Sequence, residues 1–288
     1  MTVLEAIQRS TEFLSRKQVE SARLHAELLL ANILKVPRMQ LYLNFERTLT
    51  ESELSAYREL IRRRGEREPL QHIVGSTSFC GLEIAVNRSV LIPRPETEIL
   101  AEQGWTFLNR LVEQGSKQPL ALDFGVGSGC VAIALAAKCP AAHIVAIDNS
   151  SEALSVAREN AQTNGMAAGI RFLQGDGFAA LQPGSQFDLL ISNPAYIPTS
   201  EIDALQPEVR DFDPRAALDG GADGLDFFRR IASEGQAFLK STGKCMVEFG
   251  DGQSEKLRKI FEGQNWVVDS VLDDYTHRPR VLIAGRKV

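Results

Sequence analysis

One short stretch of the chain combines an apolar run with groups that can hold a planar nitrogen. Leu190-Ile191-Ser192-Asn193-Pro194-Ala195-Tyr196 begins as a predicted buried strand and ends in an amide, a proline and an aromatic ring. The Asn193 side-chain oxygen and the Pro194 carbonyl can accept both N–H groups of an amino or amide nitrogen, and Tyr196 offers an aromatic face. The nitrogen lone pair would then face an electrophile, and such orientation supplies roughly 7–11 kcal/mol of barrier reduction. This pattern is typical of an amino-group methyltransferase.

A glycine-rich turn lies upstream, between a predicted strand and a predicted helix. Asp123 is followed two residues later by Gly125, and the turn then contains Val126, Gly127, Ser128 and Gly129. Glycines allow positive φ and a close approach of the backbone to a ligand. A nicotinamide site would prefer GxGxxG with a pyrophosphate at the helix N-terminus, and here the third glycine comes one residue early. S-adenosylmethionine has no phosphate, and its ammonium group suits the carboxylate of Asp123. We therefore expect this cofactor.

Two acidic residues are expected to contact its adenosine part. Asp148 ends the next predicted strand, where a carboxylate can accept both ribose hydroxyls. The alternative for Asp148 is capping the following helix, a role that Ser150 could fill equally well. In Gly175-Asp176-Gly177-Phe178, Asp176 can accept from the adenine amine and Phe178 can pack on the ring.

These side chains meet if the second half of the chain forms a parallel sheet. Candidate strands alternate with helices near 128–138, 151–164 and 223–240; the strands are 119–124, 143–148, 170–174, 187–192 and 243–249. Two final strands, 266–274 and 279–285, are joined by a short turn and place one antiparallel strand in the sheet. The sequence predicts an α/β fold: a seven-stranded doubly wound sheet with a C-terminal antiparallel hairpin, as in class I methyltransferases.

The first part of the chain has a different texture, with apolar residues at helical spacing. We predict a small N-terminal helical domain, a β-hairpin linker that turns near Gly81, and a catalytic domain; their ranges are 1–73, 74–92 and 93–288. Thr50 and Glu53 form a capping box that opens a helix ending at Gly65. The run Arg62-Arg63-Arg64 is expected to be a solvated helix end, with a contact to an acidic partner or RNA as the alternative.

Composition narrows the function. The net charge is −5, and residues 86–288 carry 20 Lys and Arg against 26 Asp and Glu, which makes a nucleic-acid backbone a poor partner. Histidines and cysteines lack metal-ligand spacing, so no metal is expected. Residues 1–17 lack the pattern of a signal peptide and no 18-residue apolar segment occurs, so we expect a cytoplasmic protein that does not bind membranes. We also expect a monomer.

Several longer motifs point to one family. They are Glu68-Pro69-Leu70-Gln71-His72-Ile73 with Gly75, Leu91-Ile92-Pro93-Arg94-Pro95-Glu96-Thr97-Glu98, Asp123 with Gly125, Gly127 and Gly129, Asn193-Pro194-x-Tyr196-Ile197-Pro198, Glu208-Val209-Arg210, Pro214-Arg215, and Ala217-Leu218-Asp219-Gly220-Gly221 with Asp223-Gly224. On these motifs the chain resembles the bacterial release-factor glutamine methyltransferases over essentially its whole length. The blocks 91–98 and 208–224 are more specific than the cofactor glycines, which occur across methyltransferases.

The resemblance implies a reaction and a set of site residues. The reaction is methylation of the glutamine side-chain amide in the Gly-Gly-Gln loop of class I peptide chain release factors, with S-adenosyl-L-homocysteine as product. The residues Asn193, Pro194, Ala195 and Tyr196 would hold the glutamine, and the helical domain would help to dock the protein substrate. Cofactor contacts are implied for Gly125, Val126, Gly127, Ser128, Gly129, Asp148, Gly177 and Asn193.

One position departs from the family pattern, which is Asn-Pro-Pro-Tyr. Ala195 stands where the second proline belongs. The Pro194 carbonyl is kept, but alanine frees φ, adds an N–H and relaxes the restriction on the preceding residue. We expect reduced activity with cofactor binding intact.

Three other functions compete with this one. A nucleic-acid methyltransferase acting on adenine N6 or guanine N2 would use the same tetrapeptide, with Tyr196 stacked on a flipped base. The net charge and the block 91–98 disfavour it. A cofactor-binding scaffold inactivated by Ala195 is the non-enzymatic alternative. A nicotinamide oxidoreductase fails on glycine spacing and on the lack of a hydride-site residue.

Overall fold

The computed structural model describes residues 1–287, which form two compact units. The first unit contains Met1–Ser76 together with the short segment Gln206–Phe212. The second unit contains Thr77–Leu205 and the chain from Asp213 onward. Residues 206–212 therefore pack with a part of the chain that precedes them by more than a hundred residues, which the sequence patterns did not indicate.

The first unit is helical. Its helices are α1 (Val3–Arg16), α2 (Ala22–Leu34), α3 (Arg38–Tyr42), α4 (Glu51–Gly65), α5 (Leu70–Val74) and α9 (Pro207–Arg210). As predicted, a capping box opens α4: the Glu53 N–H donates to Thr50 Oγ1 at 3.3 Å, and the Thr50 N–H donates to Glu53 Oε2 at 2.9 Å. Tyr57 is buried in the core, where its hydroxyl donates to the Ala26 carbonyl at 3.0 Å.

The arginine run at the end of α4 is only partly the solvated helix end that was expected. Arg62 has a side chain that is 54% exposed, but that of Arg64 is 4% exposed. The Arg64 guanidinium donates to His25 Nδ1 at 3.1 Å, to the Glu68 carbonyl at 3.1 Å and to Glu208 Oε1 at 2.8 Å. The expectation was wrong for Arg64 because an acidic partner, Glu208, comes from the same chain and allows the charge to be buried.

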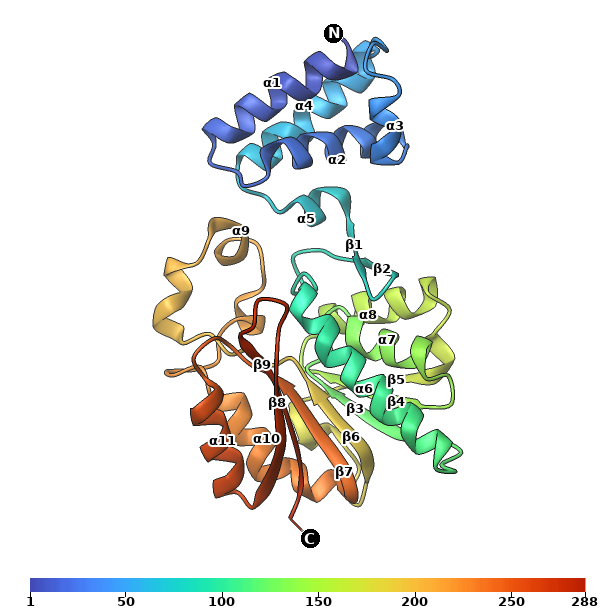
Figure 1. Cartoon of the computed structure of the whole chain (residues 1–288), viewed down its shortest axis with the longest axis vertical. Coiled ribbons are helices and arrows are strands. Elements are labelled where there is room, and N and C mark those ends of the chain that lie inside the picture. The colour runs from blue at the N-terminus through green and yellow to red at the C-terminus, as the bar shows by residue number, and fades with distance from the viewer. Residues whose placement is uncertain (288) are drawn as a thin grey trace. The chain divides into compact units, whose positions relative to one another are not determined.

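The second unit begins with a hairpin and continues as an α/β sandwich (Figure 1). The hairpin strands β1 (Ser76–Phe79) and β2 (Leu82–Ala85) turn at Gly81 as predicted. Over the described residues the large sheet has seven strands in the order β5-β4-β3-β6-β7-β9-β8. These are β3 (Leu120–Phe124), β4 (His143–Asp148), β5 (Ile170–Gln174), β6 (Phe187–Ser192), β7 (Leu239–Glu248), β8 (Trp266–Asp273) and β9 (Pro279–Arg286).

Strand pairing confirms the predicted fold class. Strands β3 to β7 are parallel, and β9 runs antiparallel to both of its neighbours, β7 and β8. Helices α6 (Pro95–Glu113), α7 (Cys130–Lys138) and α8 (Ser151–Thr163) cover one face, and α10 (Asp226–Glu234) and α11 (Ser254–Gly263) cover the other (Figure 1). Short 3-10 turns join them: η1 (Ala167–Gly169), η2 (Gly177–Ala180), η3 (Thr199–Ala204), η4 (Arg215–Ala217) and η5 (Gly235–Phe238).

The region around residue 240 needs a correction. The sequence predicted a helix near 223–240 and a strand at 243–249, whereas the helix α10 ends at Glu234 and β7 already begins at Leu239. The segment Lys240-Ser241-Thr242-Gly243 is polar, so the sequence shows no apolar pattern where the strand begins. Its pairing with β6 is irregular between Phe187 and Leu189. Apolar periodicity therefore marks only the later, regular part of this strand.

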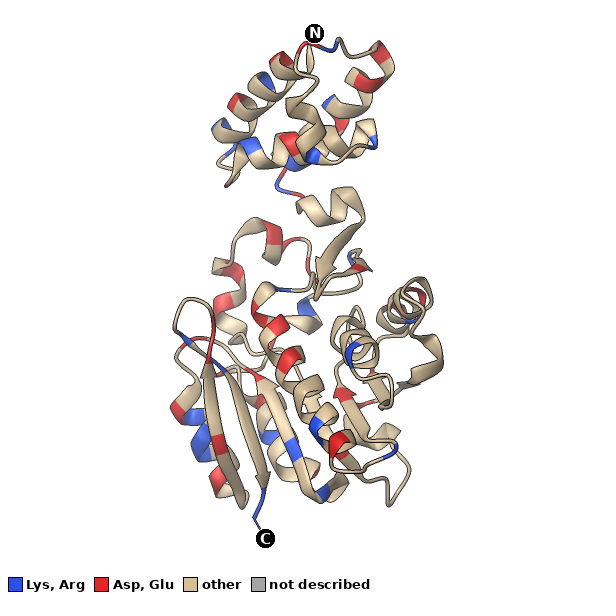
Figure 2. Ribbon diagram, turned by 45° about the vertical axis from the view of Figure 1, so that its right-hand side comes forward, with Lys and Arg blue, Asp and Glu red and all other residues tan. Residues whose placement is uncertain are grey.

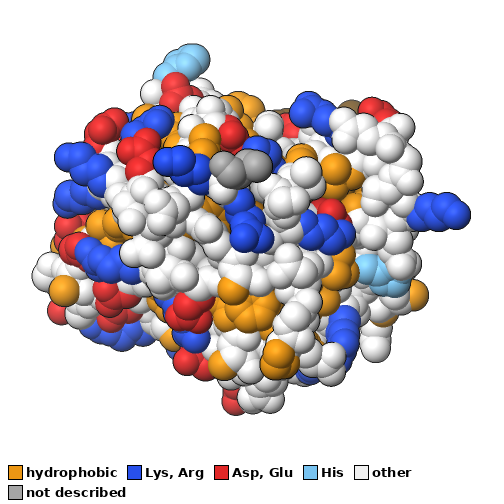
Figure 3. Space-filling view, turned by 90° about the horizontal axis from the view of Figure 1, so that it is seen from below, with side chains coloured by type: hydrophobic (Ala, Val, Ile, Leu, Met, Phe, Trp, Pro, Cys, Tyr) orange, Lys and Arg blue, Asp and Glu red, His pale blue; other side chains and the backbone are white. Residues whose placement is uncertain are grey.

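Charged residues of both signs are intermixed. In the first unit, acidic and basic positions both occur along the helices (Figure 2), and the face in Figure 3 shows Lys and Arg side chains among Asp and Glu side chains. Among the described residues, no helix is long and apolar enough to cross a membrane.

Candidate active site

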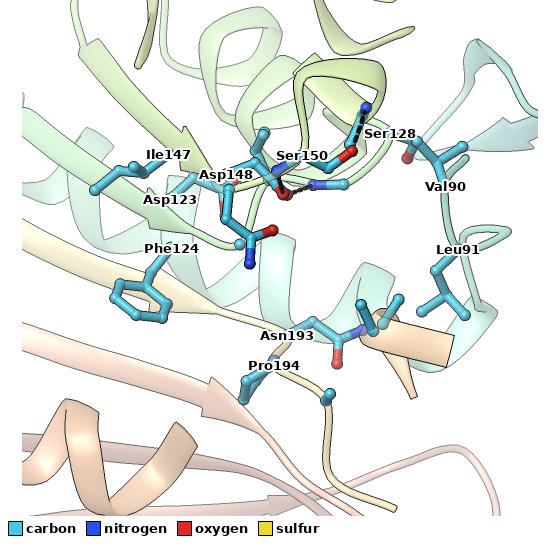
Figure 4. A pocket seen from close by; sticks show the side chains of 18 of the residues that line it. Val90, Leu91, Asp123, Phe124, Ser128, Ile147, Asp148, Ser150, Asn193 and Pro194 are labelled. Atoms are coloured by element: carbon cyan, nitrogen blue, oxygen red, sulfur yellow. Dashed lines mark hydrogen bonds between the residues drawn. The ribbon is translucent and has the colours of Figure 1, made fainter. Parts of the chain in front are cut away.

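A cavity of about 240 Å³ lies at the carboxyl ends of the parallel strands, within the second unit. Figure 4 shows Asp148 and Ser128 on one side, Val90 and Leu91 on another, and Asn193 with Pro194 on a third. The predicted site residues that line the cavity are Gly125, Val126, Gly127, Ser128, Asp148, Gly177, Asn193, Pro194 and Ala195. Within the described chain, the lining does not include Gly129 or Tyr196.

The glycine turn is shaped by its backbone. Gly127 has φ +52° and Gly129 has φ +84°, in the left-handed region that favours glycine. A side chain at Gly129 would also place a Cβ 3.1 Å from that of Ala157 on α8. Gly129 therefore allows α7 to begin close to α8, and the rest of the turn faces the cavity.

Asp148 holds this turn in place. Its Oδ2 accepts from the Gly127 N–H at 2.9 Å and its Oδ1 from the Ser150 N–H at 3.0 Å (Figure 4). Ser150 caps α8, because its hydroxyl accepts from the Ala153 N–H at 3.0 Å. The capping role that was the alternative for Asp148 thus falls to Ser150. The carboxylate oxygens of Asp148 keep lone pairs for further donors, so ribose binding stays a prediction.

Asp123 lines the cavity beside this turn and is 2% exposed. Its Oδ2 accepts from the Ala132 N–H of α7 at 3.0 Å. Burial raises the pKa of Asp123 to about 7, against the lowering effect of that hydrogen bond, and the negative charge of Asp148 raises it further. A cation beside this carboxyl would relieve the cost of its charge.

The adenine end of the cavity differs from the expectation. Phe178 does not pack on the cavity: it is 3% exposed and stacks on Phe238 with ring centroids 5.1 Å apart. Arg230 of α10 lines the cavity instead and forms an ion pair with Asp176. A Cβ at Gly177 would lie 2.9 Å from the Phe124 ring, so glycine is required by the close packing here. The expectation for Phe178 was wrong because the aromatic core competes for its ring.

The acceptor side of the cavity begins where β6 ends. Asn193 Nδ2 donates to the Thr97 hydroxyl oxygen at 3.0 Å. Thr97 lies in the first turn of α6 and is 2% exposed. The Ser192 hydroxyl donates to the Phe124 carbonyl at 2.6 Å, which ties the end of β6 to the end of β3. The Asn193 side chain is thereby held beside the glycine turn.

Tyr196 points away from this lining. Its hydroxyl donates to Glu248 Oε1 at 3.4 Å, and its carbonyl accepts from Gln253 Nε2 at 2.8 Å. Glu248 ends β7 and is 1% exposed. Burial raises the pKa of Glu248 to about 7. The Thr97 hydroxyl, the positive charge of Arg280 and the Tyr196 hydroxyl each act to lower it. Contact between Tyr196 and a substrate stays a prediction, since its side chain here supports the loop.

Sequence reasoning missed several residues that build the site. Arg94 lines the cavity and pairs with Asp213 at 2.6 Å. Buried Asn160 of α8 bridges the hairpin and the glycine turn, because its amide donates to the carbonyls of Ala85 at 3.0 Å and Ser128 at 2.9 Å. Arg94 and Thr97 belong to the motif 91–98, which was noted but given no role. No periodicity could have found Asn160.

The comparisons with known proteins agree with this geometry. A family model described as PrmC N-terminal domain matches residues 5–75, and one described as methyltransferase small domain matches residues 102–205. A solved structure of a methyltransferase from Pyrococcus furiosus is similar in fold, with a TM-score of 0.51 and 16% identity over 72% of this chain and 90% of that one. The sheet order, the glycine turn and the domain match define a class I methyltransferase, a class that uses S-adenosylmethionine.

Closer relatives narrow the class. The release factor glutamine methyltransferase of Geobacter sulfurreducens is 44% identical over 90% of this chain and 88% of its own length. The protein of that description from Chlorobaculum tepidum is 40% identical over 98% of this chain and 96% of its own length. The chain belongs to the release factor glutamine methyltransferase family.

Proposed function

We propose that this protein methylates the side-chain amide nitrogen of the glutamine in the Gly-Gly-Gln motif of class I peptide chain release factors. The observation that carries the proposal is the shared cavity: Asn193, Pro194 and Ala195 line the same 240 Å³ space as the glycine turn and Asp148. A methyl donor and an amide acceptor would therefore meet in one cavity. The relatives named for this reaction match almost the whole chain.

The cofactor half of the cavity fits S-adenosylmethionine, which supplies a methyl group already activated on a sulfonium. Asp123 would hold the ammonium of its methionine part, and Asp148 would accept from the ribose hydroxyls. Gly125, Val126, Gly127 and Ser128 would approach it with their backbone, and Gly177 would leave room for adenine. Gly129 would contribute indirectly, because it allows α7 to begin close to α8.

The acceptor half would hold the glutamine amide. Asn193 Oδ1 and the Pro194 carbonyl would accept its two N–H groups and aim the lone pair at the methyl carbon. The bound cofactor would supply its methyl group to this nitrogen and leave as the thioether, and the nitrogen would then lose a proton to water. Because the methyl is already activated, neither a strong base nor a metal is needed. Tyr196 would keep the loop in place through Glu248, and the product would be S-adenosyl-L-homocysteine.

The partner in this proposal is a protein, without direct contact to nucleic acid or membrane. Support comes from the acidic balance of residues 86–288 and from the mixture of charges along the helical unit (Figure 2). We propose that residues 1–73 help to dock the release factor. A monomeric enzyme in the cytoplasm, where release factors act, completes the proposal.

The experiment is methyl transfer from labelled S-adenosylmethionine to a purified class I release factor. The control is the same factor with its Gly-Gly-Gln glutamine changed to alanine, and we expect label on the first and none on the second. Asn193→Ala should lose most of this activity and keep most of its cofactor affinity, because Asn193 is only one of the implied cofactor contacts. Label on neither factor, with cofactor binding confirmed by calorimetry, would contradict the proposal; label on nucleic acid would replace it with the base-methylating alternative.

A further inference from the structure

A second cavity lies in the second unit, away from the catalytic one. Its volume is about 440 Å³, and it lies at the amino ends of the parallel strands, where Leu120 begins β3, His143 begins β4 and Phe187 begins β6. The catalytic cavity lies at the carboxyl ends of the same strands. At about 3.3 Å per residue, the lengths of β3 and β4 separate the two ends by roughly 13–17 Å. A small molecule in the second cavity would therefore leave the catalytic cavity free.

The second cavity forms where one connection of the sheet lacks a long helix. The connections after β3 and β4 contain α7 and α8, whereas residues 175–186, which join β5 to β6 and are all described, contain only the short turn η2. Strand β5 is also an edge strand of the sheet (Figure 1). Ala180 and Leu181 of this connection line the cavity. The cavity is therefore bounded by the sheet on one side and by an irregular segment on the other.

The strand face that lines this cavity carries half-buried apolar side chains. Side chains alternate between the two faces of a strand. The pairing of Leu120 with His143 and of Val145 with Arg171 therefore places these residues on one face, which Leu173 shares. Leu120, Val145 and Leu173 pack against the core but stay partly exposed. A covering helix would normally bury such side chains of a parallel sheet, so their apolar surface is available to a ligand.

The rim of the second cavity is positively charged. Lys240 pairs with Asp188 Oδ2 at 2.7 Å, and the same oxygen accepts from the Leu120 N–H at 2.8 Å. Arg171 is exposed and has no ion-pair partner within residues 1–287, and the described lining contains no Asp or Glu. The charge of Lys240 is thus balanced, whereas that of Arg171 is not. In a protein with a net charge of −5, this rim is a local site that attracts anions.

A cation beside an apolar surface favours a ligand that has both characters. An inorganic anion would pair with Arg171 and leave the apolar strand face in water. A wholly apolar molecule would cover that face and leave the guanidinium without a partner. The exposed imidazole of His143, at the same rim, can donate a further hydrogen bond to an anionic group. The size of the cavity also fits, because small-molecule sites typically measure about 300–1,000 Å³.

We propose that the second cavity binds a small organic anion. Its carboxylate, sulfonate or phosphate group pairs with Arg171, and its apolar body lies on Leu120, Val145 and Leu173. The site is separate from the catalytic cavity and does not depend on methyl transfer.

The first test uses two fluorescent probes that differ in charge. The probe 8-anilinonaphthalene-1-sulfonate carries a sulfonate on an aromatic body, and N-phenyl-1-naphthylamine has the same body without the sulfonate. Saturation with S-adenosyl-L-homocysteine first closes the cofactor part of the catalytic cavity to both probes. We expect saturable binding of the sulfonate probe to the parent and weaker binding of the neutral probe. Absence of saturable binding of the sulfonate probe would overturn the proposal.

The second test reverses the charge at the rim. Arg171→Glu should raise the Kd of the sulfonate probe about tenfold or more and change the Kd of the neutral probe by less than about twofold. Arg110→Glu makes the same change at an exposed arginine of α6 and should leave both Kd values near those of the parent. Thermal unfolding shows whether both variants are folded. Equal Kd values of the sulfonate probe for the parent and Arg171→Glu would overturn the role of Arg171.

The third test locates the bound probe. In ¹⁵N spectra of the cofactor-saturated protein, the sulfonate probe should shift the backbone amides of Leu120, His143 and Leu173 and leave those of Gly125 and Gly127 in place. Shifts confined to the glycine turn, or scattered over the surface as for an adventitious additive only, would overturn the proposal. Displacement of the probe by an excess of release factor would assign the cavity to a protein partner, and the small-molecule site would then be wrong.

Discussion

Asp123 is a carboxyl that the fold buries at the cofactor cavity before any cation is present. Its pKa of about 7 means that it is partly protonated at neutral pH, mainly because of burial. An ammonium group bound beside it favours the charged form and lowers this pKa. The cofactor should therefore bind preferentially when Asp123 is ionised, and its affinity should rise as the pH increases through about 7.

This linkage can be measured by calorimetry with S-adenosyl-L-homocysteine, which keeps the ammonium group. Between pH 6 and pH 8 the Kd of the parent should fall about tenfold, since each pKa unit corresponds to a tenfold change. Asp123→Asn should bind more weakly at pH 8 and show little dependence on pH over this range. A parent Kd that is the same at both pH values would rule out this account of Asp123.

Ala195 is the second residue at which we predict an effect on activity. It is 7% exposed and lines the cavity next to Pro194. The loop is closely packed here, since a Cβ at Gly220 would lie 2.8 Å from the Ala195 carbonyl oxygen. Proline at 195 would remove one free dihedral angle from the acceptor loop. We expect Ala195→Pro to raise the single-turnover rate up to about tenfold by better orientation, with unchanged cofactor affinity; equal rates would show that the packed loop is already rigid enough.

At the scale of elements, the sequence predicted the strands that have a clear apolar pattern. The strands β4, β5 and β6 have the predicted bounds, because each is a compact apolar run closed by polar residues. The same patterns brought Asp148 and Asn193 to one sheet edge. The sequence patterns could not place Thr97 or Arg230 in the cavity. Periodicity predicts which face of a helix is buried, but it does not predict which loop that face contacts. Phe178 was expected at the cavity but lies in the core, because an aromatic ring can pack in an apolar core as well as against a ligand.

The segment 206–212 is an element that only tertiary contacts define. Glu208 accepts from Arg64 at 2.8 Å and from Arg67 at 2.7 and 2.6 Å. Burial raises the pKa of Glu208, but the hydrogen bonds from Arg67 and Arg64 outweigh this and lower the pKa to about 2. A depressed pKa adds stability that is complete above the unfolded value near 4.5 and is lost as the pH falls toward 2.

Glu208→Gln should therefore lower the free energy of unfolding of the helical unit by about 1–3 kcal/mol at pH 7. The difference from the parent should shrink as the pH falls below about 4.5, because the parent then loses the same charge. Urea unfolding followed at pH 7 and pH 4 measures this. Glu201→Gln, at an exposed position, is the matched control and should leave both midpoints unchanged. A parental midpoint for Glu208→Gln at pH 7 would contradict the stabilising role.

At the scale of the whole molecule, the two units do not correspond to two continuous stretches of sequence. The helical unit is completed by residues 206–212, which follow the acceptor loop along the chain. In native-state hydrogen exchange, we expect the amides of α9 to lose their protection together with those of α1, α2 and α4. The strands of the large sheet should lose protection separately. Exchange of α9 together with β6 and β7 would instead assign the segment to the catalytic unit.

The discontinuous helical unit also limits how such a protein can be recombined. Exchanging residues 1–76 for those of a relative would place a foreign helix end against Glu208, and a relative without arginines at positions 64 and 67 would leave this partly buried carboxylate without its two ion-pair partners. A chimaera that keeps this ion pair must carry both pieces, 1–76 and 206–212, from one parent. The second piece begins ten positions after Tyr196, the last residue of the acceptor tetrapeptide, so each exchange of the helical unit also replaces a segment of the chain that follows this tetrapeptide. For this architecture, the part that would recognise a partner and the part that would modify it are inherited together.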